Sequence, residues 1–227
     1  CIIEATMTGE RRKFKREGEE RRRDALISAA LDLISEGGPG SATVRAIADR
    51  AGVTPGLIRH YFQSKEELTR EAYRALMQRM NNDNATVLDQ APADPRARLA
   101  DYVAAALRPP VLDPRRMGLW AGFIHQVRRD ADMAAVHAET YLGYRDTLQG
   151  LIAALPAPND PTRHRAMAIA CNGVIDGLWL EGCALPSAFA PGELEQIALQ
   201  AVGAITGHDL LPYLSPTDGA PLPESAP

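Results

Sequence analysis

Thr54, Arg59 and His60 are the polar side chains whose types and spacing best fit a defined chemistry. Arginine carries a planar fork of N–H donors that matches a guanine edge or a phosphate, and threonine and histidine add single polar contacts. All three lie in residues 43–62, which read TVRAIADRAGVTPGLIRHYF. A short helix that turns them outward would fit the major groove of duplex DNA.

The stretch around these side chains predicts two short crossed helices joined by a tight turn. Ala48 is small enough for a close helix crossing, and Gly52 tolerates the positive φ that the turn needs. Ile47, Val53 and Ile58 stand at offsets that face a small shared core. These offsets favour a helix-turn-helix over an ordinary helical hairpin, and the second helix of that motif enters the major groove.

Helices are expected on both sides of this pair. Residues 21–35 place Leu26, Ala30 and Leu33 on one face of a helix that ends at a glycine-rich stretch. Ser64 and Glu67 form a capping box that opens a further helix, which runs to about residue 81. Residues 21–81 therefore form the expected DNA-binding domain.

The remainder of the chain indicates a larger helical domain over residues 82–210. Proline-rich interruptions separate helices expected at 95–107, 114–129, 131–155, 162–184 and 191–206. No strand-type alternation is seen, so the predicted fold class is all-α. Residues 1–20 are expected to form a flexible basic leader, and residues 211–227 a disordered Pro-rich tail.

The distribution of charge is more informative than the total of -4 over 227 residues. Residues 1–91 carry 15 Lys and Arg against 14 Asp and Glu, whereas the rest carries 10 against 15. A basic cluster over residues 11–23 suits an arm that faces phosphates. Acidic side chains are mixed into it, so an ordinary solvated segment is the alternative.

Other functional classes find little support in the sequence. Cys1, Cys171 and Cys183 suit neither a disulfide framework nor a metal site, and the cytoplasm is the expected location. No apolar stretch reaches the roughly 20 residues of a membrane span, and the charged start is unlike a signal peptide. With no nucleophile–base pair, phosphate loop or metal-ligand spacing, we expect no enzyme activity, cofactor, metal or membrane partner. Since the first residue is Cys, the true start is left open.

The run TVRAIADRAGVTPGLIRHYFQSKEELTREAYRAL, preceded by RRRDALISAALDLISEGG, resembles the DNA-binding domain of the TetR family of repressors over roughly residues 20–80. The segments LWAGFIHQV (119–127) and GVIDGLWLEGCAL (173–185) resemble its BetI-like branch. The resemblance implies a homodimeric repressor on a palindromic double-stranded operator. A small-molecule effector, choline-like or another cation, would release it. An architectural DNA-binding protein without an effector is one alternative, and an enzyme with an accessory helix-turn-helix is another.

The resemblance also assigns roles to individual positions. The DNA contacts it implies are Thr43, Arg45, Thr54, Pro55, Gly56, Arg59, His60, Tyr61 and Lys65. Arg59 is the candidate for base readout, and Thr43 and Lys65 are candidates for phosphate contacts. Tyr61 suits a backbone contact and the domain core equally, and a solvated surface position is the alternative for Arg45.

The effector site is expected among aromatic residues of the C-terminal helices. The candidates are Trp120, Phe123, Tyr141, Tyr144, Asp176 and Trp179. Asp176 is flanked by apolar residues, and a buried carboxylate needs a partner, which a cation held between aromatic rings would supply. Alternatively, the tryptophans belong to the core and Asp176 pairs with an arginine or a backbone amide.

Small and apolar positions recur along residues 162–184 and 191–206. Such stripes suit close helix packing, and in the TetR resemblance this pair of helices from each subunit forms the dimer interface. The same stripes also suit an intramolecular core. Dimerisation is what a helix-turn-helix requires to read both halves of a palindrome.

Overall fold

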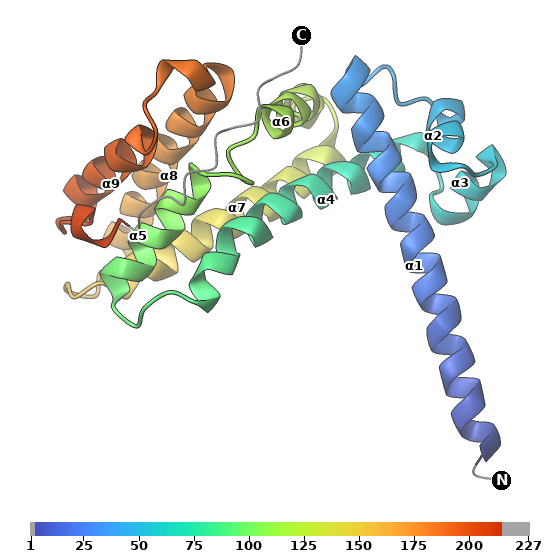
Figure 1. Ribbon diagram of the computed structural model, residues 1–227, viewed down its shortest axis with the longest axis horizontal. Coiled ribbons are helices and arrows are strands. Elements are labelled where there is room, and N and C mark those ends of the chain that lie inside the picture. Colours follow the sequence, from blue (N-terminus) through green and yellow to red (C-terminus); the bar gives the residue numbers. More distant parts are fainter. Residues whose placement is uncertain (1–2, 215–227) are drawn as a thin grey trace. The chain divides into compact units, whose positions relative to one another are not determined.

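A computed structural model describes the backbone of residues 3–214 and the side chains of residues 18–214. These residues form α-helices and short 3₁₀ helices without a strand, which confirms the all-α class (Figure 1). The elements are α1 (Ile3–Gly37), α2 (Val44–Ala51), α3 (Pro55–Tyr61), α4 (Lys65–Ala85), η1 (Thr86–Asp89), α5 (Pro95–Ala106), α6 (Pro114–Val127), α7 (Ala131–Ala153), α8 (Pro161–Ala184), η2 (Pro186–Ala188), α9 (Glu193–Thr206) and η3 (Leu211–Tyr213).

The chain divides into two compact units. The first contains the chain up to Ala75 together with Leu119–Met133, and the second contains Leu76–Gly118 and the chain from Ala134 onward. This division differs from the boundary expected at residue 81, because most of α6 belongs to the first unit. Phe123 of α6 is fully buried there, with its ring 4.9 Å from that of Tyr73 on α4.

The first unit is built around the contact between α2 and α3. Ala48 and Ile47 of α2 and Ile58 of α3 are all buried in the core of this unit. Gly52 ends α2 at φ 65°, and the N–H groups of Gly52 and Val53 bond to the carbonyls of Asp49 and Ala48. This is the Schellman arrangement, in which a left-handed residue satisfies the last carbonyls of a helix.

The N-terminal segment differs from the expected flexible leader. Helix α1 begins at Ile3, so the backbone is already helical through most of residues 1–20. Glu, Lys and Arg dominate residues 10–23, and these residues have high helix propensity. Opposite charges also recur there at a spacing of four residues, which favours helix. The composition that suggested a solvated leader is therefore also a helix-forming composition.

The second unit has its core around α5, α8 and α9. Leu99 and Val103 of α5, and Ala198 and Leu199 of α9, are fully buried. Helices α8 and α9 pack against each other, and α5 lies against both. The guanidinium Nε of Arg108 lies 2.9 Å from Oε1 of Glu195, whose side chain is 6% exposed. This ion pair compensates the burial of a carboxylate in the first turn of α9.

The C-terminal segment was expected to be disordered from residue 211. Leu211–Tyr213 instead form η3, which packs against α5 and α9. The Arg96 Nη1 on α5 lies 3.4 Å from the Tyr213 hydroxyl, which attaches this turn to the second unit. The expectation for residues 215–227 falls outside the residues that the structure describes.

The turn at Gly52 predicts a local stability effect. Replacing Gly52 by Ala forces a Cβ into left-handed backbone, which costs on the order of 1–2 kcal/mol in the free energy of unfolding. Gly118→Ala is the matched control, because Gly118 lies in α6, lacks a positive φ and has open space at its Cβ position. Urea unfolding of both variants measures the difference, and equal stabilities would contradict the assigned role of Gly52.

Candidate functional site

The outward face of α3 carries most of the candidate DNA contacts. Thr54, Pro55, Gly56, Arg59 and His60 are all exposed. Thr54 is the N-cap residue of α3, but its hydroxyl makes no capping hydrogen bond to the helix. The structure therefore turns the first residues of α3 and Arg59 toward solvent, as a recognition helix requires.

The opposite face of α3 anchors the helix. Ile58 and Phe62 are 2% and 1% exposed, so they belong to the core of the first unit. The guanidinium carbon of Arg23 lies 5.2 Å above the Phe62 ring, and Arg23 is itself held by an ion pair with Glu71. Tyr61 is half-buried, and its ring meets that of His60 edge to face at 5.1 Å. Both of the roles considered for Tyr61 remain compatible with this position.

Two further candidates stand at helix starts beside α3. Thr43 caps α2, and its Oγ1 accepts a hydrogen bond from the Ala46 N–H at 3.1 Å. Its hydroxyl proton remains a donor. Lys65 is the first residue of α4, after Ser64, whose Oγ accepts from the Glu67 N–H at 3.1 Å. A helix start combines exposed N–H groups with a favourable dipole, which suits a phosphate oxygen.

The arginines of this region fall into two groups. Arg50 is bound by Glu36 through two hydrogen bonds of 2.8 and 2.7 Å, which commits it to an intramolecular ion pair. Arg45 and Arg59 are exposed and form no ion pair among the described side chains. They are therefore the guanidinium groups of the motif that can meet an external anion or base edge.

The second unit contains a polar cluster between α7 and α8. The Tyr141 hydroxyl of α7 donates a hydrogen bond to Oδ2 of Asp176 on α8. Nδ2 of Asn172, one turn earlier on α8, lies 2.6 Å from the Tyr141 oxygen and 2.8 Å from Oδ2 of Asp176. We call Asp176, Tyr141 and Asn172 the carboxylate cluster. Burial raises the pKa of the Asp176 carboxyl, and the two hydrogen bonds oppose that shift.

Aromatic rings accompany the carboxylate cluster. The His137 ring stacks on Tyr141 with centroids 5.1 Å apart, and burial lowers the pKa of His137. Tyr144 stacks on Tyr102 of α5 at 5.2 Å, and the electrostatic influence of Asp176 reaches Tyr144. The Tyr144 hydroxyl is buried without a hydrogen-bond partner. The structure therefore brings Tyr141, Tyr144 and Asp176 close to one another.

Two of the remaining effector candidates are positioned by contacts with other residues. The Trp179 indole N–H donates to the Val111 carbonyl at 3.0 Å, and the side chain is 9% exposed in the core of the second unit. Trp120 and Phe123 belong to the first unit, where Phe123 packs on Tyr73. Trp179 and Phe123 are therefore held by contacts that anchor the fold.

Comparisons with known proteins assign the chain to a family. The model described as bacterial regulatory proteins, tetR family, matches residues 26–72, and the BetI-type transcriptional repressor C-terminal model matches residues 95–207. The HTH-type transcriptional regulator BetI of Rhizobium meliloti is 32% identical over 162 residues, which cover 70% of this chain and 76% of the relative. The chain belongs to the BetI-type branch of the TetR family. It is a DNA-binding transcriptional regulator, and the sequence resemblance is confirmed.

Further relatives of this TetR-family regulator extend the match. BetI of Burkholderia cenocepacia is 29% identical over 200 residues, covering 88% of this chain and 96% of the relative. A transcriptional regulator structure from Pseudomonas aeruginosa has a TM-score of 0.75 at 31% identity and covers 86% of this chain and 95% of that one. One from Saccharomonospora viridis, solved in complex with choline, shares the fold with a TM-score of 0.65 at 19% identity, covering 79% of this chain and 94% of that one. These proteins are named as regulators rather than enzymes.

Two residues at the carboxylate cluster of the TetR-family chain were not predicted from the sequence. Asn172 is 4% exposed and bridges Tyr141 and Asp176, and Tyr102 is buried beneath Tyr144. Asn172 stands four residues before Asp176 in an otherwise apolar run, and this helical spacing was the available signal. Tyr102 is an isolated aromatic in an Ala-rich helix, and nothing in its spacing relates it to Tyr144.

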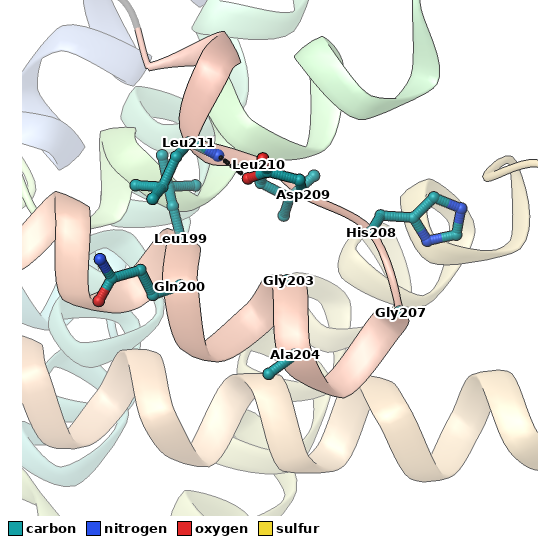
Figure 2. A pocket seen from close by; sticks show the side chains of 9 residues that line it. All are labelled: Leu199, Gln200, Gly203, Ala204, Gly207, His208, Asp209, Leu210 and Leu211. Atoms are coloured by element: carbon teal, nitrogen blue, oxygen red, sulfur yellow. Dashed lines mark hydrogen bonds between the residues drawn. The ribbon is translucent and has the colours of Figure 1, made fainter.

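A surface pocket lies where α9 ends. Gln200 and Ala204 of α9 line one side, and the returning segment with His208 and Leu211 lines the other (Figure 2). The Asp209 carboxylate in its wall accepts from the Leu211 N–H at 3.1 Å. A Cβ on Gly203 would lie 2.6 Å from the His208 carbonyl oxygen, so the segment closes tightly over the helix.

The described residues of the TetR-family chain provide neither a metal site nor a membrane-spanning helix. The described side chains contain no group of three His, Cys, Asp or Glu that could hold a metal ion. None of the described helices has the length and apolar character that a membrane crossing requires. Cys171 and Cys183 are buried thiols, and burial raises the pKa of each to about 11.

The raised pKa of Asp176 predicts a pH dependence of stability. Burial favours the neutral carboxyl, so the folded chain binds more protons than the unfolded chain just above the ordinary pKa of 3.8. The free energy of unfolding therefore falls as pH rises through this window, and Asp176→Asn removes that contribution. Urea unfolding between about pH 4 and pH 7 measures both chains. Parallel pH profiles for the two chains would contradict the assignment.

Proposed function

We propose that the protein is a homodimeric repressor that binds a palindromic operator through α3 and is released by a small cationic effector. The observation that carries this proposal is the exposed face of α3. Arg59 points outward there, and α3 is joined to α2 by the tight turn at Gly52. Because operator DNA lies in the cytoplasm, we propose that location for the protein.

In this proposal, different residues contact the bases and the phosphates. Arg59 lies in the last turn of α3, and a guanidinium can bond the O6 and N7 acceptors of guanine together. Thr54, Pro55 and Gly56 start the helix, where small side chains allow the backbone to approach the groove. The phosphate and sugar contacts, which fix the register, come from the end of α3 and from the starts of α2 and α4 in this proposal. They are His60 and Tyr61 on α3, Thr43 and Arg45 at the start of α2, and Lys65 at the start of α4.

Replacing Arg59 by Ala should relax base preference. The duplexes come from the region flanking its own gene. Loss of a bidentate base contact should weaken binding to the preferred duplex by about 1–3 kcal/mol and leave binding to duplexes with a single base changed at the contacted position nearly unchanged. Lys65→Ala should instead weaken all duplexes alike and reduce the salt dependence. Fluorescence anisotropy titrations over a range of salt concentrations separate the two effects.

The control for both variants is Arg128→Ala, an exposed arginine at the end of α6 and outside the helix-turn-helix. It should keep the wild-type affinity and base preference. If Arg59→Ala weakened every duplex by the same factor, the assignment of base readout to Arg59 would be wrong.

The proposed dimer surface lies on α8 and α9. Its exposed or half-exposed residues are small or apolar and share one side of each helix: Ala166, Ile169, Ala170, Gly173, Gly177, Leu180, Ile197, Ala201 and Ala204. Ile169, Leu180 and Ile197 are 44%, 47% and 40% exposed, which is unusual for large apolar side chains. Small residues between them permit close helix approach, so a second copy of this chain would cover the surface.

Leu180→Arg should weaken the dimer by placing an unpaired charge in that surface. The expected loss is at least ~2 kcal/mol, or roughly 30-fold in the dimer dissociation constant. Leu142→Arg is the matched control, because Leu142 on α7 is also partly exposed, at 37%, and lies outside the proposed surface. Analytical ultracentrifugation measures both variants, and an unchanged dissociation constant for Leu180→Arg would contradict this surface.

The effector site in this proposal is the carboxylate cluster with its neighbouring rings. A partly buried carboxylate and stacked aromatic side chains suit a cation. The structural neighbour from Saccharomonospora viridis was solved with choline, which is a cation. A ligand that binds better to one conformation shifts the population away from the DNA-binding state. Helices α4, α6 and α7 each contribute residues to both units, which gives the chain continuous elements for this coupling.

A further inference from the structure

The hydrogen bonds of the carboxylate cluster converge on one atom. The Tyr141 hydroxyl and the Asn172 Nδ2 both donate to Oδ2 of Asp176, and Nδ2 also reaches the Tyr141 oxygen. These contacts fix the orientation of the Asn172 amide, because the reversed amide would set its oxygen against a carboxylate oxygen. The Tyr141 hydroxyl and the Asn172 amide N–H groups therefore donate within the cluster itself.

Acceptor atoms are left over around the same cluster. Oδ1 of Asn172 is buried and has no hydrogen-bond partner, and the Asn172 side chain is 4% exposed. The Tyr144 oxygen is likewise buried without a partner. Buried acceptors that lack a donor are costly, so their presence indicates that a further group supplies N–H or O–H. Asn172 Oδ1 therefore needs a donor, and the Tyr144 hydroxyl, which can donate as well as accept, needs a partner of either kind.

We propose that the effector of this protein carries a protonated amine with N–H groups, and that the carboxylate cluster selects it over a quaternary ammonium. This proposal rests on the effector site proposed above. An ammonium with N–H groups would donate to Asn172 Oδ1 and the Tyr144 oxygen while its charge compensates Asp176. A quaternary ammonium offers the same charge and stacks against the same rings, but it has no hydrogen to donate.

The expected selectivity rests on the cost of leaving a buried hydrogen-bond acceptor without a donor. A site built to bond an N–H strongly rejects an analogue that lacks it, because the buried acceptors then lose both water and partner. Burial of the Asp176 carboxyl, which raises its pKa, is consistent with a position that needs a cation.

The test is a ligand series that changes only the number of N–H groups. Ethanolamine, N-methylethanolamine, N,N-dimethylethanolamine and choline are titrated into the full-length protein by isothermal titration calorimetry, at a pH where the three amines are protonated. We expect the dissociation constant to rise with each methyl group and to differ by at least ~10-fold between ethanolamine and choline. Operator binding is measured in parallel.

The outcomes separate this inference from the proposed function. If choline binds as tightly as ethanolamine or more tightly, the N–H selection is overturned while the cationic effector stands. If no member binds to a protein that still binds its operator, both the inference and the cationic effector site are overturned, and ordered water satisfies the acceptors. If operator binding itself fails, the repressor proposal fails independently of the titrations.

Variants identify the atoms responsible. Asn172→Leu removes the unpartnered acceptor and should bring the ratio of the choline and ethanolamine dissociation constants close to 1. Tyr144→Phe removes only a hydroxyl and keeps the stacked ring, so it provides a second test if Asn172→Leu lowers stability. Asn82→Leu, at an exposed position on α4, is the control. Undiminished discrimination in both Asn172→Leu and Tyr144→Phe would overturn the role of these acceptors.

Discussion

The close contact of α2 and α3 is the constraint on which the account depends. It requires a side chain as small as Ala48 at the contact and a left-handed residue at Gly52, and both are present. With Ile58 buried on the inner side, the helical period places Arg59 outside. The chemistry proposed for Arg59 therefore follows from packing, because the core determines which side of α3 faces solvent.

In the second unit, the polar groups proposed to bind the effector are instead partly or fully buried. Asp176 and Asn172 lie among apolar residues of α8 and are compensated mainly by each other and by Tyr141. Such a cluster contributes little to stability compared with an apolar core, which is consistent with the ligand-binding role proposed for it. The exposed apolar side of the same helix is available for a second subunit. In the proposed function, α8 therefore faces the effector on one side and a second subunit on the other.

Helix positions were predictable from the sequence because prolines and caps define them locally. Pro95, Pro114 and Pro161 begin α5, α6 and α8, as expected of a residue that suits the first helical turn. The assignment of most of α6 to the first unit was not predictable, because it depends on the packing of Phe123 against Tyr73. The exposed motif residues followed from spacing, whereas the role of Asn172 required knowing which atoms its amide meets.

The central claim is that two copies of α3 read a duplex symmetrically. Selection from a pool of randomised duplexes by the full-length protein tests it most directly. The account predicts an enriched inverted repeat whose half-site centres lie about one helical turn, or a whole number of turns, apart. Enrichment of a single unpaired half-site, or no enrichment above the starting pool, would contradict it.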